Sequence, residues 1–95
     1  MIMIKENTYF EGNVKSLGFT QKDADSSIGV MATGEYTFGT EAPEKMTVVK
    51  GALTVKLPGS EEWVTYSDGQ AFDVIGDSSF DLKVETPTAY LCEYL

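Results

Sequence analysis

The 95-residue sequence contains no histidine and no arginine. Without histidine, the chain lacks the commonest protein ligand of transition metals. Arginine is the side chain best suited to hold a phosphate group through two parallel hydrogen bonds. Any phosphate site in this chain must therefore use lysine, hydroxyl groups and backbone N–H groups.

Cysteine is almost absent, and long apolar runs are missing. Cys92 is the single cysteine, which excludes an internal disulfide, and the segment MIMIKENTYF has none of the features of a secretory signal. No run approaches the roughly 18 consecutive apolar residues of a membrane span. We therefore expect a protein that acts in the cytoplasm and does not cross a membrane.

Positive charge is scarce. Fifteen acidic residues oppose seven basic ones, all of them lysine, and the formal net charge is −8. Nucleic acids and anionic membrane surfaces are bound through basic patches. The charge balance therefore argues against both as partners.

The residues that are present predict one small all-β domain over residues 1–95. Hydrophobic residues make up 42% of the chain and aromatic residues 12%, as in folded proteins. Glycines separate short segments of alternating polarity rich in β-branched and aromatic residues, with turn signals about every ten residues, whereas no long helical periodicity occurs. This spacing is typical of a β-sandwich, an OB-type barrel or a jelly-roll barrel. We expect strands at 13–19, 27–32, 34–39, 45–50, 52–57, 62–67, 70–75, 79–84 and 88–95, and a polar loop at 20–27.

Glu44 precedes the strand KMTVVK, and strand alternation predicts which way it points. Glu44, Met46, Val48 and Lys50 share one face of the strand by parity. Met46 and Val48 are apolar, so this face is expected to point inward. An inward carboxylate would have a raised pKa unless a partner compensates it. The alternative is a solvated loop charge, which is the commoner fate of a glutamate at a strand end.

Two glycine-bounded frames resemble degenerate versions of the two cupin motifs. The first runs from Gly34 through Glu44 to Gly51, and the second is Gly69-x5-Ile75-Gly76. More closely, the whole chain from Tyr9 onward resembles the small bacterial pyrimidine/purine nucleoside phosphorylases. The carrying segments are YFEGNVKSLGF, IGVMATGEYTFGT, EKMTVVKGALTVKLPGSEEW, GQAFDVIGDSSFDLKV and YLCEYL.

The resemblance implies a fold, an activity and an assembly. The fold is a single-domain cupin-type jelly-roll barrel, and the activity is phosphorolysis of purine and pyrimidine nucleosides to the free base and ribose 1-phosphate. It further implies a homodimer with phosphate as co-substrate and no other cofactor. Members of the family carry a proline in the turn occupied here by Ile75, a change that affects the backbone angle and no chemical group.

Metal-binding cupins use two or three histidines and a glutamate, so a chain without histidine predicts no transition-metal site. A hard ion bound by oxygens of Glu44, Asp73 and Asp77 stays open as an alternative.

The chemistry of phosphorolysis suggests which side chains to expect at the site. Cleavage of the glycosidic bond develops positive charge on the ribose, which an inward Glu44 would stabilise as the catalytic carboxylate. Tyrosines and phenylalanines would stack on the base, whereas phenylalanines of a small chain more often fill its core. Cys92 is expected to act as a small hydrophobic residue. The substrate-binding candidates are Tyr36, Phe38, Met46, Thr47, Lys50, Phe72, Asp77, Ser79 and Tyr90.

A second class of function also fits the pattern, because a fold does not fix a function. A barrel of this size would equally serve as a non-catalytic small-ligand-binding protein, or as a structural homodimer with a filled interior. Release of base from a nucleoside, with and without phosphate, separates these readings.

Overall fold

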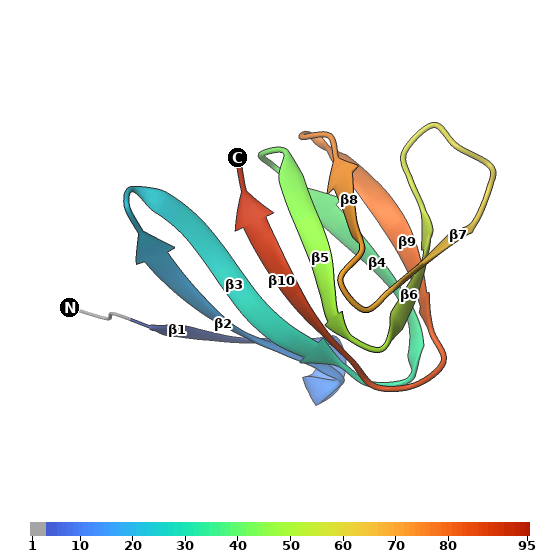
Figure 1. The fold of residues 1–95 in the computed structure, drawn as a ribbon, viewed down its shortest axis with the longest axis horizontal. Coiled ribbons are helices and arrows are strands. Elements are labelled where there is room, and N and C mark those ends of the chain that lie inside the picture. The colour runs from blue at the N-terminus through green and yellow to red at the C-terminus, as the bar shows by residue number, and fades with distance from the viewer. Residues whose placement is uncertain (1–3) are drawn as a thin grey trace.

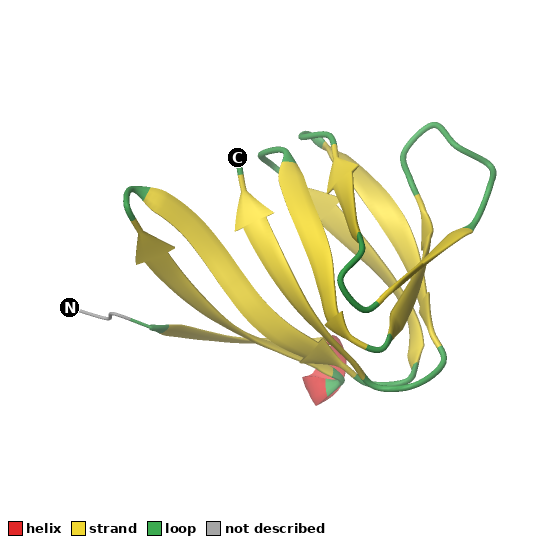
Figure 2. Cartoon of the chain, viewed as in Figure 1, coloured by secondary structure: helices red, strands yellow, loops and turns green. Residues whose placement is uncertain are grey.

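The computed structural model describes residues 4–95, and these form ten β-strands and one short 3₁₀ turn. Strands cover most of the chain (Figures 1 and 2). Their bounds are β1 Lys5–Tyr9, η1 Phe10–Gly12, β2 Val14–Gln21, β3 Ala24–Met31, β4 Gly34–Thr40, β5 Glu44–Lys50, β6 Ala52–Lys56, β7 Val64–Ser67, β8 Ala71–Val74, β9 Ser78–Val84 and β10 Thr88–Tyr94.

The strands build two antiparallel sheets packed face to face. One sheet has the order β1-β2-β3-β10-β5-β8 and the other the order β4-β9-β6-β7. Neighbours far apart in sequence, such as β3 and β10, pair within one sheet, as in a double-sheet jelly roll. The all-β jelly-roll prediction is therefore confirmed.

The core lies between the two sheets and follows the alternation of the sequence. In β9, Phe80, Leu82 and Val84 are buried, while the intervening Lys83 is exposed. Leu53 and Val55 of β6 belong to the same core from the neighbouring strand of that sheet, and Met46 and Val48 of β5 belong to it from the opposite sheet. A period of two places every second side chain on the inner face. The expected strand pattern thus determines the core directly.

The structure corrects the sequence-based prediction at the N-terminal end. Residues 20–27 were expected to be a polar loop, but β2 and β3 extend into them and leave only the turn at Lys22 and Asp23, both with positive φ. Strand β1 was not predicted at all. Strands β1 to β3 project beyond the sandwich as an arm (Figure 1), and the molecule measures 41 × 25 × 24 Å. Strand β1 and residues 20–27 at the tip of the arm lie beyond the core, so they lack the apolar alternation that marks a strand.

The connection from β4 to β5 is fastened from several sides. The Thr40 hydroxyl donates to the Ile75 carbonyl at 2.7 Å, and the Asp77 N–H donates to the Glu41 carbonyl at 3.1 Å. The Leu95 N–H donates to the Pro43 carbonyl at 2.9 Å. Ile75 lies in the turn between β8 and β9. Because this β8–β9 turn keeps its hydrogen bonds to Thr40 and Glu41 while the Ile75 side chain points to solvent, it forms without a proline at that position. These hydrogen bonds hold the β4–β5 connection in place and so position Glu44, the first residue of β5.

Candidate functional site

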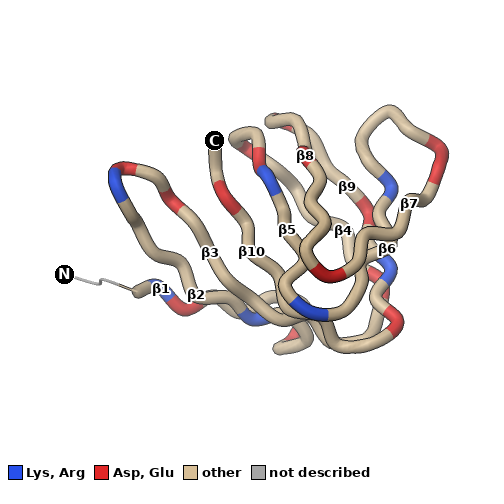
Figure 3. The backbone as a smooth tube through the Cα atoms, in the orientation of Figure 1, with Lys and Arg blue, Asp and Glu red and all other residues tan. Residues whose placement is uncertain are grey.

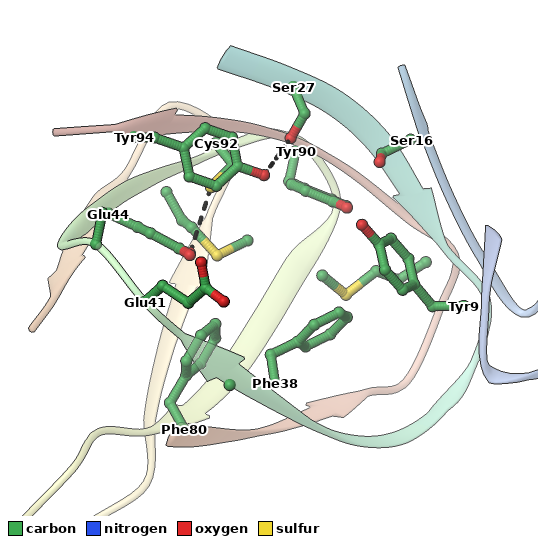
Figure 4. Close-up of a pocket in the computed structure, with 14 residues that line it drawn as sticks. Tyr9, Ser16, Ser27, Phe38, Glu41, Glu44, Phe80, Tyr90, Cys92 and Tyr94 are labelled. Atoms are coloured by element: carbon green, nitrogen blue, oxygen red, sulfur yellow. Dashed lines mark hydrogen bonds between the residues drawn. The ribbon is translucent and has the colours of Figure 1, made fainter. Parts of the chain in front are cut away.

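A cavity of about 360 Å³ opens between the two sheets, and Figure 4 shows the side chains that line it. This volume lies near the lower end of the range for small-molecule sites, about 300–1,000 Å³. The wall combines carboxylates, hydroxyls, aromatic rings and sulfur. The lining residues are Tyr9, Ser16, Ser27, Met31, Phe38, Gly39, Glu41, Ala42, Glu44, Met46, Phe80, Tyr90, Cys92 and Tyr94.

Glu44 begins β5, which lies between β10 and the edge strand β8 in the six-stranded sheet. It lies opposite Val74 of β8 and Tyr94 of β10, so both neighbours of β5 hold its backbone. Its side chain is half-buried and points into the cavity, like that of Met46 two residues later. Figure 4 shows the Glu41 carboxylate also directed into the cavity from the β4–β5 connection. The two carboxylates give this end of the cavity a negative charge.

The environment of Glu44 raises its pKa above the usual glutamate range. Burial is the main cause, and the hydrogen bond that the Cys92 thiol donates to Oε1 at 3.4 Å acts in the opposite direction. The same surroundings raise the pKa of Cys92 strongly, through burial and the negative charge of Glu44. The thiol therefore stays protonated and donates to the carboxylate.

Hydroxyl groups form the wall next to the carboxylates. Tyr94 and Ser27 share a hydrogen bond of 3.1 Å between their oxygens, and Ser16 and Tyr90 line the same wall. Burial raises the pKa of Tyr94 to about 12 and that of Tyr90 further still. Both phenols are therefore neutral near pH 7 and can donate hydrogen bonds to a ligand.

Tyr90 reaches the cavity because its cross-strand partner is a glycine. Tyr90 lies opposite Gly29 of β3. A Cβ at position 29 would stand 2.6 Å from the Tyr90 hydroxyl and 2.7 Å from the Lys15 carbonyl oxygen, closer than real contacts allow. Gly29 thus makes room for the Tyr90 side chain across the sheet.

Aromatic rings close the opposite side of the cavity. Phe38 stacks on Phe80 with ring centroids 6.0 Å apart, and Tyr9 meets the Phe38 ring edge-on at 6.1 Å. Phe10, in the 3₁₀ turn, packs on Phe38 at 5.2 Å. Phe10 and Glu11 both have positive φ, so the chain bends sharply here to carry Tyr9 and Phe10 over the cluster. The turn therefore connects the arm to the aromatic side of the cavity.

Of the residues predicted for the site, Glu44, Phe38, Met46 and Tyr90 line this cavity. The prediction that Lys50 shares the face of Glu44 is wrong. The register of β5 against β10 shifts between Ala89 and Tyr90, and Lys50 lies opposite Ala89. This bulge breaks the parity, and Lys50 is exposed on the outer face.

The remaining predicted residues lie elsewhere. Tyr36 is buried, and its hydroxyl donates to the Ala32 carbonyl at 2.7 Å. Phe72 fills the core between Tyr66 and Phe80, as the core-filling alternative expected. Three polar candidates, Thr47, Asp77 and Ser79, are absent from the cavity lining, and Asp77 and Ser79 are exposed.

Sequence reasoning missed several lining residues. Tyr94 and Cys92 share the parity of Tyr90, so the alternation of β10 contains the signal that could have found them. Ser16, Ser27 and Tyr9 come from the arm formed by β1, β2 and β3. The sequence patterns predicted neither β1 nor the full length of β2 and β3. Glu41 lies in a connection, where no periodicity applies.

Two further observations concern ions and membranes. Glu44 and Asp73 lie on opposite faces of the sheet, because Asp73 pairs with Lys45 and not with Glu44. Within residues 4–95, no three or more His, Cys, Asp or Glu side chains cluster closely enough to hold a metal ion.

No helix in the same range is long and apolar enough to cross a membrane.

Sequence comparison places the chain in a known family. A family model described as pyrimidine/purine nucleoside phosphorylase matches residues 4–94. The chain belongs to this family. A pyrimidine/purine nucleoside phosphorylase of Vibrio atlanticus is 72% identical over 93 residues, which cover 98% of this chain and 100% of that relative.

Solved structures agree on the fold of the family. A crystal structure of a protein of unknown function from Vibrio parahaemolyticus is 67% identical and superposes with a TM-score of 0.94, covering 97% of this chain and 98% of the other. An RmlC-like cupin from Shewanella frigidimarina superposes with a TM-score of 0.74 at 15% identity, covering 98% of this chain and 93% of that one. At that identity the likeness concerns the fold alone, which is the cupin-type jelly roll.

Proposed function

We propose that the protein is a nucleoside phosphorylase of broad specificity that acts on purine and pyrimidine nucleosides. A phosphate oxygen forms a bond to C1′ of the ribose while the bond from C1′ to the base nitrogen breaks. The bonding electrons leave with the base, and the proton released from the phosphate ends on the base. The products are the free base and ribose 1-phosphate, so the reaction is a pentosyl transfer without a covalent enzyme intermediate.

The observation that carries this proposal is the inward Glu44 carboxylate in a half-open cavity of a chain from this family. Positive charge develops on the ribose as the glycosidic bond breaks, and a fixed carboxylate that is partly shielded from water stabilises that charge. Glu44 is half-buried and held by β8, β10 and the Cys92 thiol. Glu41 adds a second negative charge in the same cavity. We assign the ribose to this end.

The base is expected against the aromatic side. Tyr9, Phe38 and Phe80 line this side of the cavity, and aromatic rings pack against every base, which agrees with a broad range of nucleosides. The neutral phenols of Tyr90 and Tyr94 are available to hydrogen-bond to polar atoms of the ligand. Phosphate as co-substrate is the one small molecule required besides the nucleoside, and no further cofactor enters the proposed reaction.

We also propose that the protein acts as a homodimer. Strands β2, β3 and β10 present an apolar outer face that includes Leu17, Ile28 and Val30, all more than 40% exposed. A second copy would cover this face. Acidic positions are spread over both sheets (Figure 3), which disfavours nucleic acid and anionic membranes as partners. The free thiol of Cys92 suits the reducing cytoplasm.

The test incubates the purified protein with uridine or adenosine, with and without phosphate, and measures free base. We expect base release that depends on phosphate and one equivalent of ribose 1-phosphate per base. Release of base without phosphate would indicate a hydrolase. No release from any nucleoside would favour the non-catalytic binding protein instead.

A further inference from the structure

A second hollow of about 380 Å³ adjoins the cavity on the concave side of the arm. Tyr9, Ser27 and Tyr94 line both spaces, so the side hollow and the cavity form one continuous surface. Its other lining residues come from β1, β2 and β3: Lys5, Asn7, Gly18, Phe19, Thr20, Asp25 and Ser26. The reaction proposed above needs space for two substrates, and the molecule offers two connected spaces.

The strands of the arm are polar on the inside and apolar on the outside. Ser16 and Ser27 point inward and are only 5% and 4% exposed, whereas Leu17 and Ile28, their neighbours in sequence, are 45% and 44% exposed. A sheet with one face in the protein usually has the opposite pattern, with apolar side chains inside. An inner face made of hydroxyls and amides offers many hydrogen-bonding groups to a polar ligand.

The charges divide the combined surface into two parts. Glu41 and Glu44 line the cavity but not the side hollow. Among the described residues that line either space, Lys5 alone carries a positive charge. An anionic ligand is therefore repelled from the cavity end and attracted toward Lys5.

Donors converge where the two spaces meet. The hydroxyls of Ser27 and Tyr94, hydrogen-bonded to each other at 3.1 Å, stand at the junction. The Asn7 side-chain amide donates to the Ser16 hydroxyl at 3.5 Å on the same inner face. Asp25 is the one opposing charge, and its carboxylate accepts a hydrogen bond from the Thr20 hydroxyl at 2.6 Å. In a chain without arginine, lysine, hydroxyl and amide groups are the side-chain donors available to a phosphate.

We propose that the side hollow is the subsite for inorganic phosphate, with Lys5 as its cation and the Ser27 and Tyr94 hydroxyls at its inner edge. The inference rests on the proposed function, because it assigns the second substrate of that reaction. Because Glu41 and Glu44 do not line the side hollow, a phosphate bound there is not placed directly against the carboxylates that stabilise the ribose cation. Lys50, Thr47 and Ser79, which the sequence analysis predicted as substrate-binding residues, line neither space.

The kinetic test compares Lys5→Met with Lys15→Met. Both lysines are exposed and lie on neighbouring strands, and both substitutions remove one positive charge, but Lys15 lines neither space. At constant ionic strength we expect Lys5→Met to raise the phosphate KM about tenfold or more, the effect of one charged hydrogen bond. The nucleoside KM should stay unchanged, and Lys15→Met should match the wild type in both constants. Asp25→Asn should lower the phosphate KM.

Two results would overturn the assignment. One is an equal phosphate KM for the two lysine variants, and the other is a rise in nucleoside KM that accompanies the rise for phosphate in Lys5→Met. Circular dichroism and thermal unfolding confirm that both variants fold.

A binding measurement separates this inference from the function on which it rests. The line width of the ³¹P resonance of inorganic phosphate is followed as protein is added without nucleoside. Broadening by the wild type and Lys15→Met, but not by Lys5→Met, supports the subsite even if no nucleoside is cleaved. Turnover of nucleosides together with equal broadening by all three proteins rejects the subsite and leaves the proposed function standing.

Discussion

The carboxylate of Glu44 and the thiol of Cys92 lie next to each other in the cavity wall. The thiol donates to the carboxylate at 3.4 Å, and burial raises the pKa of both groups. For stabilising a ribose cation, Glu44 must be ionised. Activity is therefore expected to rise with pH through the pKa of Glu44, which lies above the ordinary glutamate range.

Replacing the thiol should move this pH dependence. In Cys92→Ala the carboxylate loses a hydrogen bond that lowers its pKa, so the acidic limb of the kcat/KM profile should shift to higher pH. Cys92→Ser keeps a donor at the same place and should leave the limb close to that of the wild type. Identical limbs for the alanine and serine variants would show that the thiol does not act on Glu44.

Glu44 should also limit the stability of the protein at neutral pH. Its folded-state pKa is raised by burial, so the ionised form is disfavoured on folding. This penalty is absent below the unfolded-state pKa, about pH 4, and grows as the pH rises through the folded-state pKa. The free energy of unfolding of Glu44→Gln minus that of the wild type should therefore be larger at pH 8 than at pH 4. Thermal unfolding at the two pH values measures this, and an unchanged difference would contradict it.

At the scale of elements, the arm formed by β1, β2 and β3 shows what sequence patterns can and cannot predict. The core strands β4, β5, β6, β9 and β10 were predicted within one or two residues, because each buries every second side chain. Strand β1 and the outer halves of β2 and β3 have no core on their inner face. Without burial no apolar alternation arises, so these segments resemble loops in the sequence.

The candidate site shows the same division. The alternation of side chains along a regular strand predicted that Glu44 and Met46 face the same way, and both line the cavity. The same alternation along β10 places Tyr94 on the face of Tyr90. Parity failed for Lys50, because a bulge in β5 is decided by its pairing with β10, which is distant in sequence. Ser16 and Ser27 were missed because the sequence does not reveal which face of an arm is concave.

The contact between β3 and β10 allows a test at one glycine. In Gly29→Ala the new methyl group would meet the Lys15 carbonyl and the Tyr90 hydroxyl below 3 Å. We expect a loss of about 1–3 kcal/mol in the free energy of unfolding, as for other overpacked sites, and a higher nucleoside KM because Tyr90 is displaced. Gly18→Ala on β2 is the stability control, since its nearest contacts would be 3.7 and 3.8 Å. Equal denaturant midpoints for the two variants would contradict this account of Gly29.

For the molecule as a whole, the apolar outer face of the arm is where we propose that a second copy binds. Val30 of β3 is 53% exposed and lies opposite Lys15 and Ala89. Val30→Glu should convert a dimer into a monomer, because a charge in an apolar interface is costly, while the cross-strand Lys15 compensates it within the monomer. Val64→Glu on the edge strand β7, where the valine is 44% exposed, should remain dimeric. Light scattering coupled to size exclusion measures both, and an unchanged mass for Val30→Glu would place the interface elsewhere.

In the reaction that we propose, this cavity cleaves nucleosides with phosphate and the charge of Glu44 stabilises the ribose cation. The most direct measurement follows formation of ribose 1-phosphate by ³¹P NMR from uridine and phosphate, for the wild type and Glu44→Gln in the same buffer. We predict that the wild type forms ribose 1-phosphate and uracil in equal amounts, and that folded Glu44→Gln does so about 10²-fold more slowly. If Glu44→Gln formed ribose 1-phosphate at the wild-type rate, the proposed role of Glu44 would be contradicted. If the wild type formed none, the proposed reaction itself would be contradicted.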